Sequence, residues 1–463
     1  EVIRSGKATV EEVVEILESR QWKVFHRIAL HVLRVFAEQA PDLVAARLTR
    51  RDLFGDAGVL HEYALLLRAA FSRLSEQERQ MILEWIAEGP DEDDPARYRE
   101  LWQRDWLARI GFENLPEEWQ ERYRTLVARY GEPMEKGVGP TSPKTADELR
   151  TMSVREIVAF LRTWEPPENV FGEPSPAGLG RTLASVVAEN PGRFAAEAEC
   201  FQDLDPTYVR ALLSGLRDGL KQQKVFDWQP VLRLCRWVLD QAREIPGRRV
   251  GPLEADLDWG ETRKAIARLL SAGFKSEGGE IPIELRGEAW GILRPLTDDP
   301  DPTPEQEAPH SGSGMDPATL SINTVRGEAM HAVICYALWV RRQFEKQVGA
   351  KKRPARSFDE MPEVREVLDA HLDTSRDPSL AVRAVYGQWF PQLTLLDRAW
   401  AEDRKDRIFP TDERSQAYFD AAWNAYIALC RPYDNVFDLL RDIYVHAIRR
   451  IGAHNASARW IKD

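Results

Sequence analysis

Apolar residues recur along most of the chain at spacings of three and four. Val10, Val13, Val14 and Leu17 form one such series, and the segment 157–161 contains another. This spacing puts the apolar side chains on one face of an α-helix, whereas strict alternation would indicate a strand. The sequence shows no alternating runs bounded by hairpin turns. The pattern therefore predicts an almost entirely α-helical chain.

Helix starts are marked by capping boxes, in which a Ser or Thr side chain and a Glu three residues later satisfy backbone N–H groups of the first turn. An apolar series of helical period follows each of them. We therefore expect a helix to begin directly after each capping Ser or Thr. The pairs are Thr9 with Glu12, Ser75 with Glu78, Thr145 with Glu148, and Ser153 with Glu156.

The 15 tryptophans are spread along the chain instead of being gathered in one segment. Bulky anchors at many positions are typical of stacked helix pairs, each of which needs its own packing residues. We expect a HEAT-like helical-repeat α-solenoid of stacked antiparallel helix pairs. The expected anchors are Trp22, Trp85, Trp102, Trp106, Trp119, Trp164, Trp228, Trp237, Trp290, Trp339, Trp389, Trp400 and Trp423.

Two short segments resemble the second half of a HEAT unit. Residues 377–383 read DPSLAVR, and residues 323–326 read NTVR. In that family the Asp caps one helix and the Arg reaches across to a neighbouring repeat. The resemblance thus implies that Asp377 caps a helix and that Arg383 contacts the next unit, beside an apolar seam.

The length of 463 residues exceeds what one hydrophobic core usually serves, so the chain should divide. Three stretches rich in Gly, Pro and charged residues interrupt the helical pattern, at 131–144, 244–258 and 296–317. We expect three helical blocks. These are an N-terminal block at 1–140, a central block at 141–300, and a C-terminal block at 301–463 that carries the HEAT-like segments.

Composition excludes two classes of protein. Hydrophobic residues make up 43% and charged residues 30%, and no apolar run approaches the length of a membrane span. Acidic residues outnumber basic ones, 75 to 63, which argues against general nucleic-acid binding because such binding needs a dense basic face. We expect a protein that contacts neither membranes nor, in general, nucleic acids.

The four cysteines, at 200, 235, 335 and 430, lie far apart in apolar helical segments. They form no C-x-x-C pair, so we interpret them as reduced core thiols of a cytoplasmic protein. The sequence starts at Glu1 and enters a helical pattern within ten residues. We expect it to be a piece of a longer polypeptide with further domains.

The acidic stretch within 296–317 is the best candidate for a metal site. It holds Asp298, Asp299 and Asp301, followed by Glu305, Glu307 and His310. Hard cations prefer clustered oxygen ligands, but the EF-hand spacing is missing. A solvated acidic loop is the preferred interpretation, and a metal-dependent hydrolase or nuclease that uses this loop is the alternative.

Other motifs give no catalytic site. Residues 311–314 lack the Gly that a nucleophile elbow requires, and residues 178–182 lack the Lys of a phosphate-binding loop. His331 lies on an apolar helical face, where a hydrogen-bonded core histidine is the ordinary outcome. We therefore expect no catalytic residue, no metal and no cofactor in this chain.

Aromatic and arginine residues are dense between 386 and 437. Such residues dominate the energetics of protein interfaces when they are exposed, and they act as anchors between helices when they are buried. Both interpretations stay open, as does a purely structural scaffold. The candidate partner-binding residues are Trp389, Phe390, Trp400, Arg404, Trp423, Tyr426, Arg431 and Tyr433.

Three segments, at 194–237, 323–339 and 377–390, resemble the C-terminal helical sensor region of large bacterial STAND-type NTPases, including antiviral defence proteins. In that family the helical array binds a foreign protein, such as a phage protein, and the binding releases an NTPase and an effector elsewhere in the polypeptide. The resemblance implies a sensor module that binds a protein partner on a concave surface.

Overall fold

The computed structural model describes residues 2–20, 23–56, 58–89, 96–132, 141–166, 174–248, 255–307, 315–348 and 357–450. These residues are mostly helical and contain no β-strand, only an isolated bridge between Thr141 and Pro174. The predicted all-α helical-repeat class is confirmed. No helix in the described ranges is long and apolar enough to cross a lipid bilayer.

The chain forms two compact units, Glu1–Gly139 (unit 1) and Pro140–Asp463 (unit 2). Unit 1 has its own hydrophobic cluster, in which Phe54 stacks on Trp106 at 4.1 Å between ring centroids. Its helices are α1 (Val10–Glu18), α2 (Lys23–Val35), α3 (Pro41–Leu48), α4 (Arg51–Phe54), α5 (Leu60–Ala70), α6 (Glu76–Glu88), α7 (Ala96–Ile110) and α8 (Glu117–Tyr130), with the 3-10 helices η1 (Phe71–Arg73) and η2 (Phe112–Asn114).

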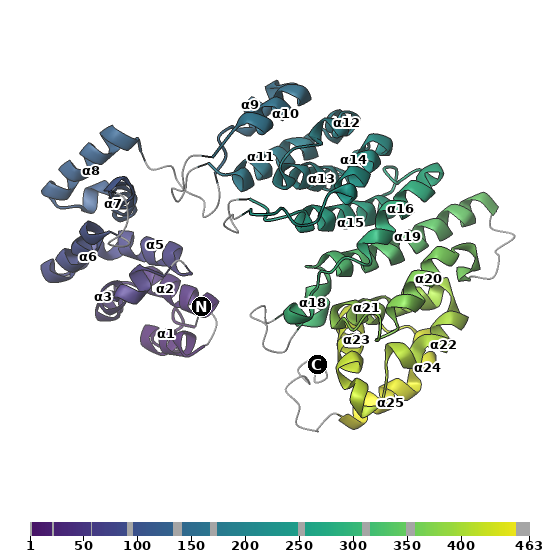
Figure 1. Cartoon of the computed structure of the whole chain (residues 1–463). Helices are drawn as coiled ribbons and strands as arrows, with labels where there is room; N and C mark the ends of the chain where they lie inside the picture. Colours follow the sequence, from purple (N-terminus) through teal and green to yellow (C-terminus); the bar gives the residue numbers. More distant parts are fainter. Residues whose placement is uncertain are drawn as a thin grey trace. The chain divides into compact units, whose positions relative to one another are not determined.

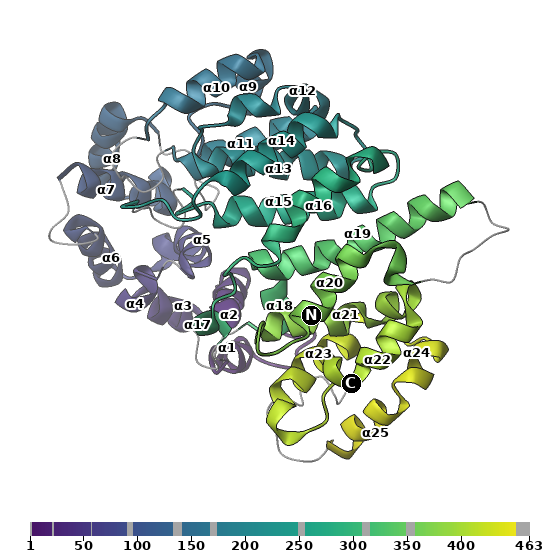
Figure 2. The ribbon, with the colours of Figure 1, turned by 45° about the vertical axis from the view of Figure 1, so that its right-hand side comes forward.

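One layer of unit 2 consists of α11 (Pro176–Glu189), α13 (Pro206–Lys221), α15 (Gly260–Lys275), α19 (Val325–Val348), α21 (Leu380–Leu396) and α23 (Gln416–Leu429). Each of these helices packs on the next one in this order. Figures 1 and 2 show the same succession from two directions. We call this row of helices the stacking layer.

The other helices of unit 2 flank the stacking layer. Thus α12 packs on α13, α14 on α15, α16 and α20 on α19, and α22 on α21. Their bounds are α9 (Ala146–Thr151), α10 (Val154–Thr163), α12 (Pro191–Ala196), η3 (Ala198–Phe201), α14 (Trp228–Asp240), η4 (Ile283–Leu285), α16 (Arg286–Leu296), α17 (Pro304–Glu307), α18 (Pro317–Ser321), η5 (Phe358–Glu360), α20 (Pro362–His371), α22 (Arg398–Ile408), η6 (Glu413–Ser415), α24 (Asp434–Leu439) and α25 (Arg441–Arg450).

The four predicted capping boxes are all formed. Helices α1, α6, α9 and α10 begin directly after the capping Ser or Thr, and in each the N3 Glu returns a hydrogen bond to the cap backbone. One expected cap is different. Ser379, the residue directly before α21, accepts from the Val382 N–H at 3.1 Å, whereas Asp377 lies two residues too early and accepts from the Ser379 N–H at 3.2 Å.

The predicted tryptophan anchors lie in or against the two hydrophobic clusters, except for Trp22, which is outside the described residues. In unit 2 a single cluster includes residues on both sides of position 300, from Leu149 to Ala447. The predicted division into blocks at 1–140, 141–300 and 301–463 stays a prediction. The structure itself gives the two units described above.

Glycine allows the closest approach within the stacking layer, between α21 and α23. A Cβ atom added at Gly387 would overlap the carbonyl oxygen of Ala422 on α23. Backbone atoms cannot move aside as the end of a flexible side chain can, so any side chain at this position would push the two helices apart. The contact fixes the spacing of these two levels.

We expect Gly387→Ala to lower the free energy of unfolding by about 1–3 kcal/mol, the usual cost of overpacking a core. Gly287→Ala is the matched control, because Gly287 is an exposed helical glycine and a Cβ atom there would have no neighbour within 4 Å. The control should be neutral or stabilising by at most about 1 kcal/mol. Urea unfolding measures both, and an equal effect of the two substitutions would contradict the packing constraint.

Candidate functional site

Half of the candidate partner-binding residues are buried between helices of unit 2. Phe390, Trp400, Trp423 and Tyr426 each expose at most 4% of their surface. Phe390 meets Phe409 edge-on at 5.2 Å, and Trp400 meets Phe358 in the same way at 5.3 Å. In this structure these side chains act as anchors between helices and present no surface to a partner.

Trp389 and Arg404 are half-buried and engaged in internal hydrogen bonds. The Trp389 indole donates to His331 Nδ1 at 2.7 Å. Arg404 Nε donates to Asp369 Oδ1 at 2.9 Å, and the Trp400 indole donates to the same oxygen at 3.1 Å. Their polar groups thus link α21 to α19 and α22 to α20.

Arg431 and Tyr433, in contrast, are exposed, and they lie in the turn that joins α23 to α24. Large apolar neighbours are exposed beside them, namely Leu429 at 55% and Phe437 at 42%, with Tyr433 at 49%. We call residues 427–437 the α23–α24 corner. From the helical pattern alone, the exposed residues of this corner could not be distinguished from the buried aromatic residues nearby in the sequence.

The acidic segment 297–307, which we call the strap, is held by charges from distant parts of unit 2; residues 308–314 lie outside the described residues. The Asp299 carboxylate is 1% exposed and lies 3.4 Å from Arg243 Nε and 3.3 Å from Arg263 Nη1. Asp298 pairs with Arg294 and, at 3.2 Å, with Arg376. The carboxylates of Asp298 and Asp299 thus anchor the strap to the rest of unit 2 through ion pairs.

Two further strap carboxylates accept hydrogen bonds from the starts of stacking-layer helices. Asp301 Oδ2 accepts from the Val325 N–H of α19 at 2.8 Å. Glu307 Oε1 accepts from the Ala381 N–H of α21 and from the Ser379 hydroxyl, both at 2.8 Å. Anionic groups are stabilised at helix N-termini by unpaired N–H groups and by the helix dipole.

These contacts bear on the metal-site alternative. Asp298, Asp299, Asp301 and Glu307 already have cationic or N–H partners, and they point toward different helices. Glu305 is exposed, and His310 lies outside the described residues. In the described part of the chain no three His, Cys, Asp or Glu side chains form a group that could hold a metal ion. The geometry therefore does not favour a hydrolase centred on the strap.

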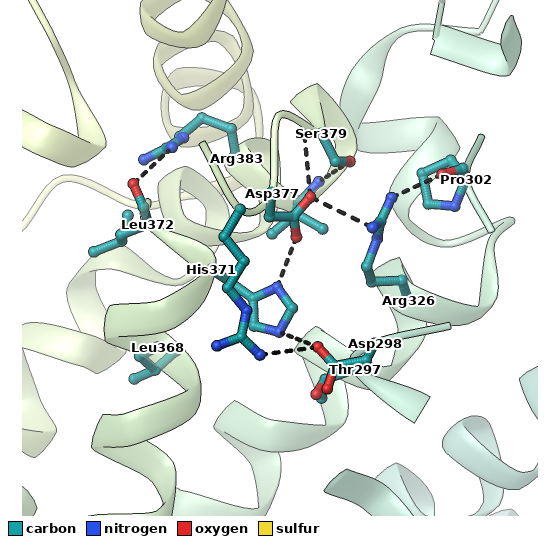
Figure 3. A network of polar contacts seen from close by, with 12 residues as sticks. Thr297, Asp298, Pro302, Arg326, Leu368, His371, Leu372, Asp377, Ser379 and Arg383 are labelled. Atoms are coloured by element: carbon teal, nitrogen blue, oxygen red, sulfur yellow. Dashed lines mark hydrogen bonds and ion pairs between the residues drawn. The ribbon is translucent and has the colours of Figure 1, made fainter. Parts of the chain in front are cut away.

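A histidine–aspartate pair joins the strap to the turn between α20 and α21 (Figure 3). His371 Nδ1 donates to Asp377 Oδ2 at 2.6 Å, and both side chains are almost fully buried. An aspartate orients the histidine of a catalytic triad in the same way. Here, however, His371 Nε2 makes no hydrogen bond to any described residue and faces Asp298 Oδ1 at 3.7 Å. This carboxylate is already paired with Arg294 and Arg376. The pair therefore fits a structural role.

Arginines of the stacking layer reach from one level to another. Arg326 of α19 donates to the Pro302 carbonyl at 2.7 Å and lies 3.6 Å from Asp377 (Figure 3). Arg383 of α21 donates to the carbonyls of Leu372 at 3.3 Å and Arg407 at 2.8 Å, near the ends of α20 and α22. Arg383 thus links α21 to the ends of two flanking helices.

An open pocket of about 390 Å³ lies between the strap and the last levels of the stacking layer. We call it the strap pocket. Its walls are mostly apolar, with one acidic and one basic side chain. The lining residues are Pro300, Pro302, Pro304, Glu307, Arg326, Pro378, Leu380, Ala417 and Tyr418. The acidic loop was recognisable in the sequence, but the opposite wall comes from residues 70 or more positions further along the chain.

His331 is a satisfied core histidine, as expected. Its Nδ1 accepts from Trp389, and its Nε2 lies 2.9 Å from Ser321 Oγ, whose own proton goes to the Ala318 carbonyl at 2.7 Å. Nε2 therefore carries the proton of a neutral ring. Burial, with a smaller contribution from Lys275, lowers the pKa of His331 from 6.5 to about 3.

The strap ion pairs should contribute to stability. We expect Asp299→Ala to lower the free energy of unfolding by about 3 kcal/mol, because it leaves the partly buried Arg263 without its carboxylate and leaves Arg243 with Asp258 alone. Glu305→Ala, an exposed change in the same segment, should stay within about 0.5 kcal/mol of the wild type. Thermal and urea unfolding test this, and equal stability of the two variants would exclude an anchoring role for the strap.

The buried neutral His331 should make stability depend on pH. The unfolded chain binds a proton near pH 6.5 and the folded chain only near pH 3, so stability is lost as the pH falls through this interval. The loss should be about 1.4 kcal/mol per pH unit below pH 6.5. Urea unfolding at pH 7.5, 6 and 5 measures it. His331→Gln should remove this slope from the wild-type curve, and parallel curves would show that His331 does not cause it.

The chain matches no protein-family model, no curated protein and no solved structure. The placement of the strap, the strap pocket and the α23–α24 corner is therefore the basis for a functional proposal.

Proposed function

We propose that this chain is a protein-recognition module that binds a partner protein on its helical surface, with the α23–α24 corner as a principal contact. The observation that carries the proposal is the exposure of Leu429, Tyr433 and Phe437 beside Arg431 within one turn of the chain. Neighbouring exposed apolar side chains of this size often mark interaction sites. Tyr and Arg are also the residue types most enriched among binding hot spots.

The polar groups that could have suggested catalysis support this choice, because they are used inside the fold. His331 is neutral and fully hydrogen-bonded, and His371 is turned toward carboxylates. The strap acids are paired with arginines and helix N-termini. Recognition of another molecule by shape and apolar contact needs none of these groups to be free.

We propose further that the module is the sensor of a larger cytoplasmic protein of bacterial defence or signalling, whose other domains respond when the partner binds. The support for this is the resemblance of segments 194–237, 323–339 and 377–390 to such sensors. In unit 2 these segments contribute to the stacking-layer helices α13, α19 and α21. The four cysteines are free thiols, which fits a reducing compartment.

Tyr433→Ala should weaken binding without affecting the fold. Partners retained from cells by the wild-type chain would be identified, purified and titrated by calorimetry. Removing an exposed aromatic anchor should raise the dissociation constant about tenfold or more, the effect of a typical hot spot. The melting temperature should stay within about 1 °C of the wild type, because Tyr433 is half-exposed and lies outside the core cluster.

Val225→Ala serves as the matched control, because Val225 is also an exposed apolar residue, at 59%, in the turn before α14. Its affinity for the same partner should equal that of the wild type. If the chain retains no specific partner, or if Tyr433→Ala binds as tightly as Val225→Ala, recognition at the α23–α24 corner is wrong. A structural scaffold would then be the better description.

A further inference from the structure

The strap pocket contains one carboxylate that has no cationic partner at hydrogen-bond distance among the described residues. Both donors to Glu307, the Ala381 N–H and the Ser379 hydroxyl, contact Oε1. Neither donor carries a full positive charge, and Glu307 forms part of the pocket wall. Burial raises the pKa of this carboxyl above its usual value. The negative charge of Glu307 is thus incompletely compensated on the pocket side.

The basic side chain of the pocket is in the opposite situation. Arg326 donates to the Pro302 carbonyl at 2.7 Å and lies 3.6 Å from the carboxylate of Asp377. These contacts hold the guanidinium against the wall and offset its charge. An anionic ligand would have to compete with Asp377 for Arg326, whereas Glu307 feels the charge of Arg326 only at a distance beyond an ion pair.

From this asymmetry we propose that the strap pocket binds a lysine or arginine side chain of the partner protein. The inference rests on the proposed recognition function and adds the chemistry of one contact. The cationic head would pair with Glu307. The aliphatic stem would lie along the proline rings of the strap and Pro378, since long basic side chains bury their methylene groups on apolar surfaces.

Tyr418, the aromatic residue of the strap pocket, has a cation on its ring. The guanidinium of Arg383 already lies over its ring, 5.3 Å from the centroid. A second cation beside the ring would also be repelled by Arg383, so the ring adds little to cation binding. The main energetic contribution is therefore assigned to Glu307 and the proline wall.

The pocket can be tested without the partner, on the purified chain. Butylguanidinium and n-butylammonium are the probes, and pentanoate is an anion of similar length. Methyl resonances of Leu380 and Ala417, both of which line the pocket, report binding by NMR. We expect both cations to shift these resonances with dissociation constants in the millimolar range, and pentanoate to leave them unchanged. Equal binding of pentanoate would overturn the proposal.

Variants separate a specific site from general attraction to an acidic protein. Glu307→Gln keeps an acceptor for Ser379 and Ala381 but removes the charge, and it should weaken cation binding at least tenfold. Glu305→Gln removes the same charge from an exposed position of α17 and should have no effect. Ala417→Leu should block the pocket without altering any strap contact. Unchanged binding by Glu307→Gln or Ala417→Leu would contradict the proposal.

A capped tripeptide with a central arginine tests whether the pocket binds a protein side chain or a free small-molecule cation. If the pocket accepts a side chain of a protein, this peptide should bind at least as well as butylguanidinium. Binding of butylguanidinium alone would point to a free small-molecule cation and would overturn the assignment to a protein side chain. Because no partner is needed, this result is independent of the Tyr433→Ala experiment on the α23–α24 corner.

Discussion

Arginine side chains that leave their own helix and end on another level connect unit 2 along its length. Arg210 of α13 pairs with Asp256 at 2.6 Å, Arg263 of α15 lies 3.3 Å from Asp299, and Arg326 of α19 lies 3.6 Å from Asp377. If only apolar surfaces were packed together, neighbouring helices could be shifted relative to one another into several positions. A partly buried arginine, however, reaches its carboxylate in only one of these positions, because a displaced guanidinium would lose its partner while staying desolvated.

The strap is an extension of the same principle. Its carboxylates meet arginines from the α14–α15 region on one side and the N-terminal N–H groups of α19 and α21 on the other. An acidic loop of this kind costs solvation energy when it is buried, and the cost is offset only where cations and helix N-termini converge. The same convergence forms one wall of the strap pocket, which includes Glu307.

Local features were the ones that the sequence predicted well. Capping boxes such as Thr9 with Glu12 depend on residues three positions apart, so their hydrogen bonds are readable from the sequence. The partners of Asp299, in contrast, are Arg243 and Arg263, which are 56 and 36 residues away in the sequence, and no local pattern predicts these ion pairs. Helical period likewise shows which residues share a face but not which neighbour covers it. This is why buried Trp423 and exposed Tyr433 looked alike.

The reach of the strap changes how the array should come apart. In a simple repeat array each level touches only its neighbours, so unfolding can begin at one end and proceed level by level. The strap bonds to the loop after α14, to α15, and to the starts of α19 and α21. These levels therefore form one cooperative block, and fraying from the C-terminal end should stop at α21, before the strap is released.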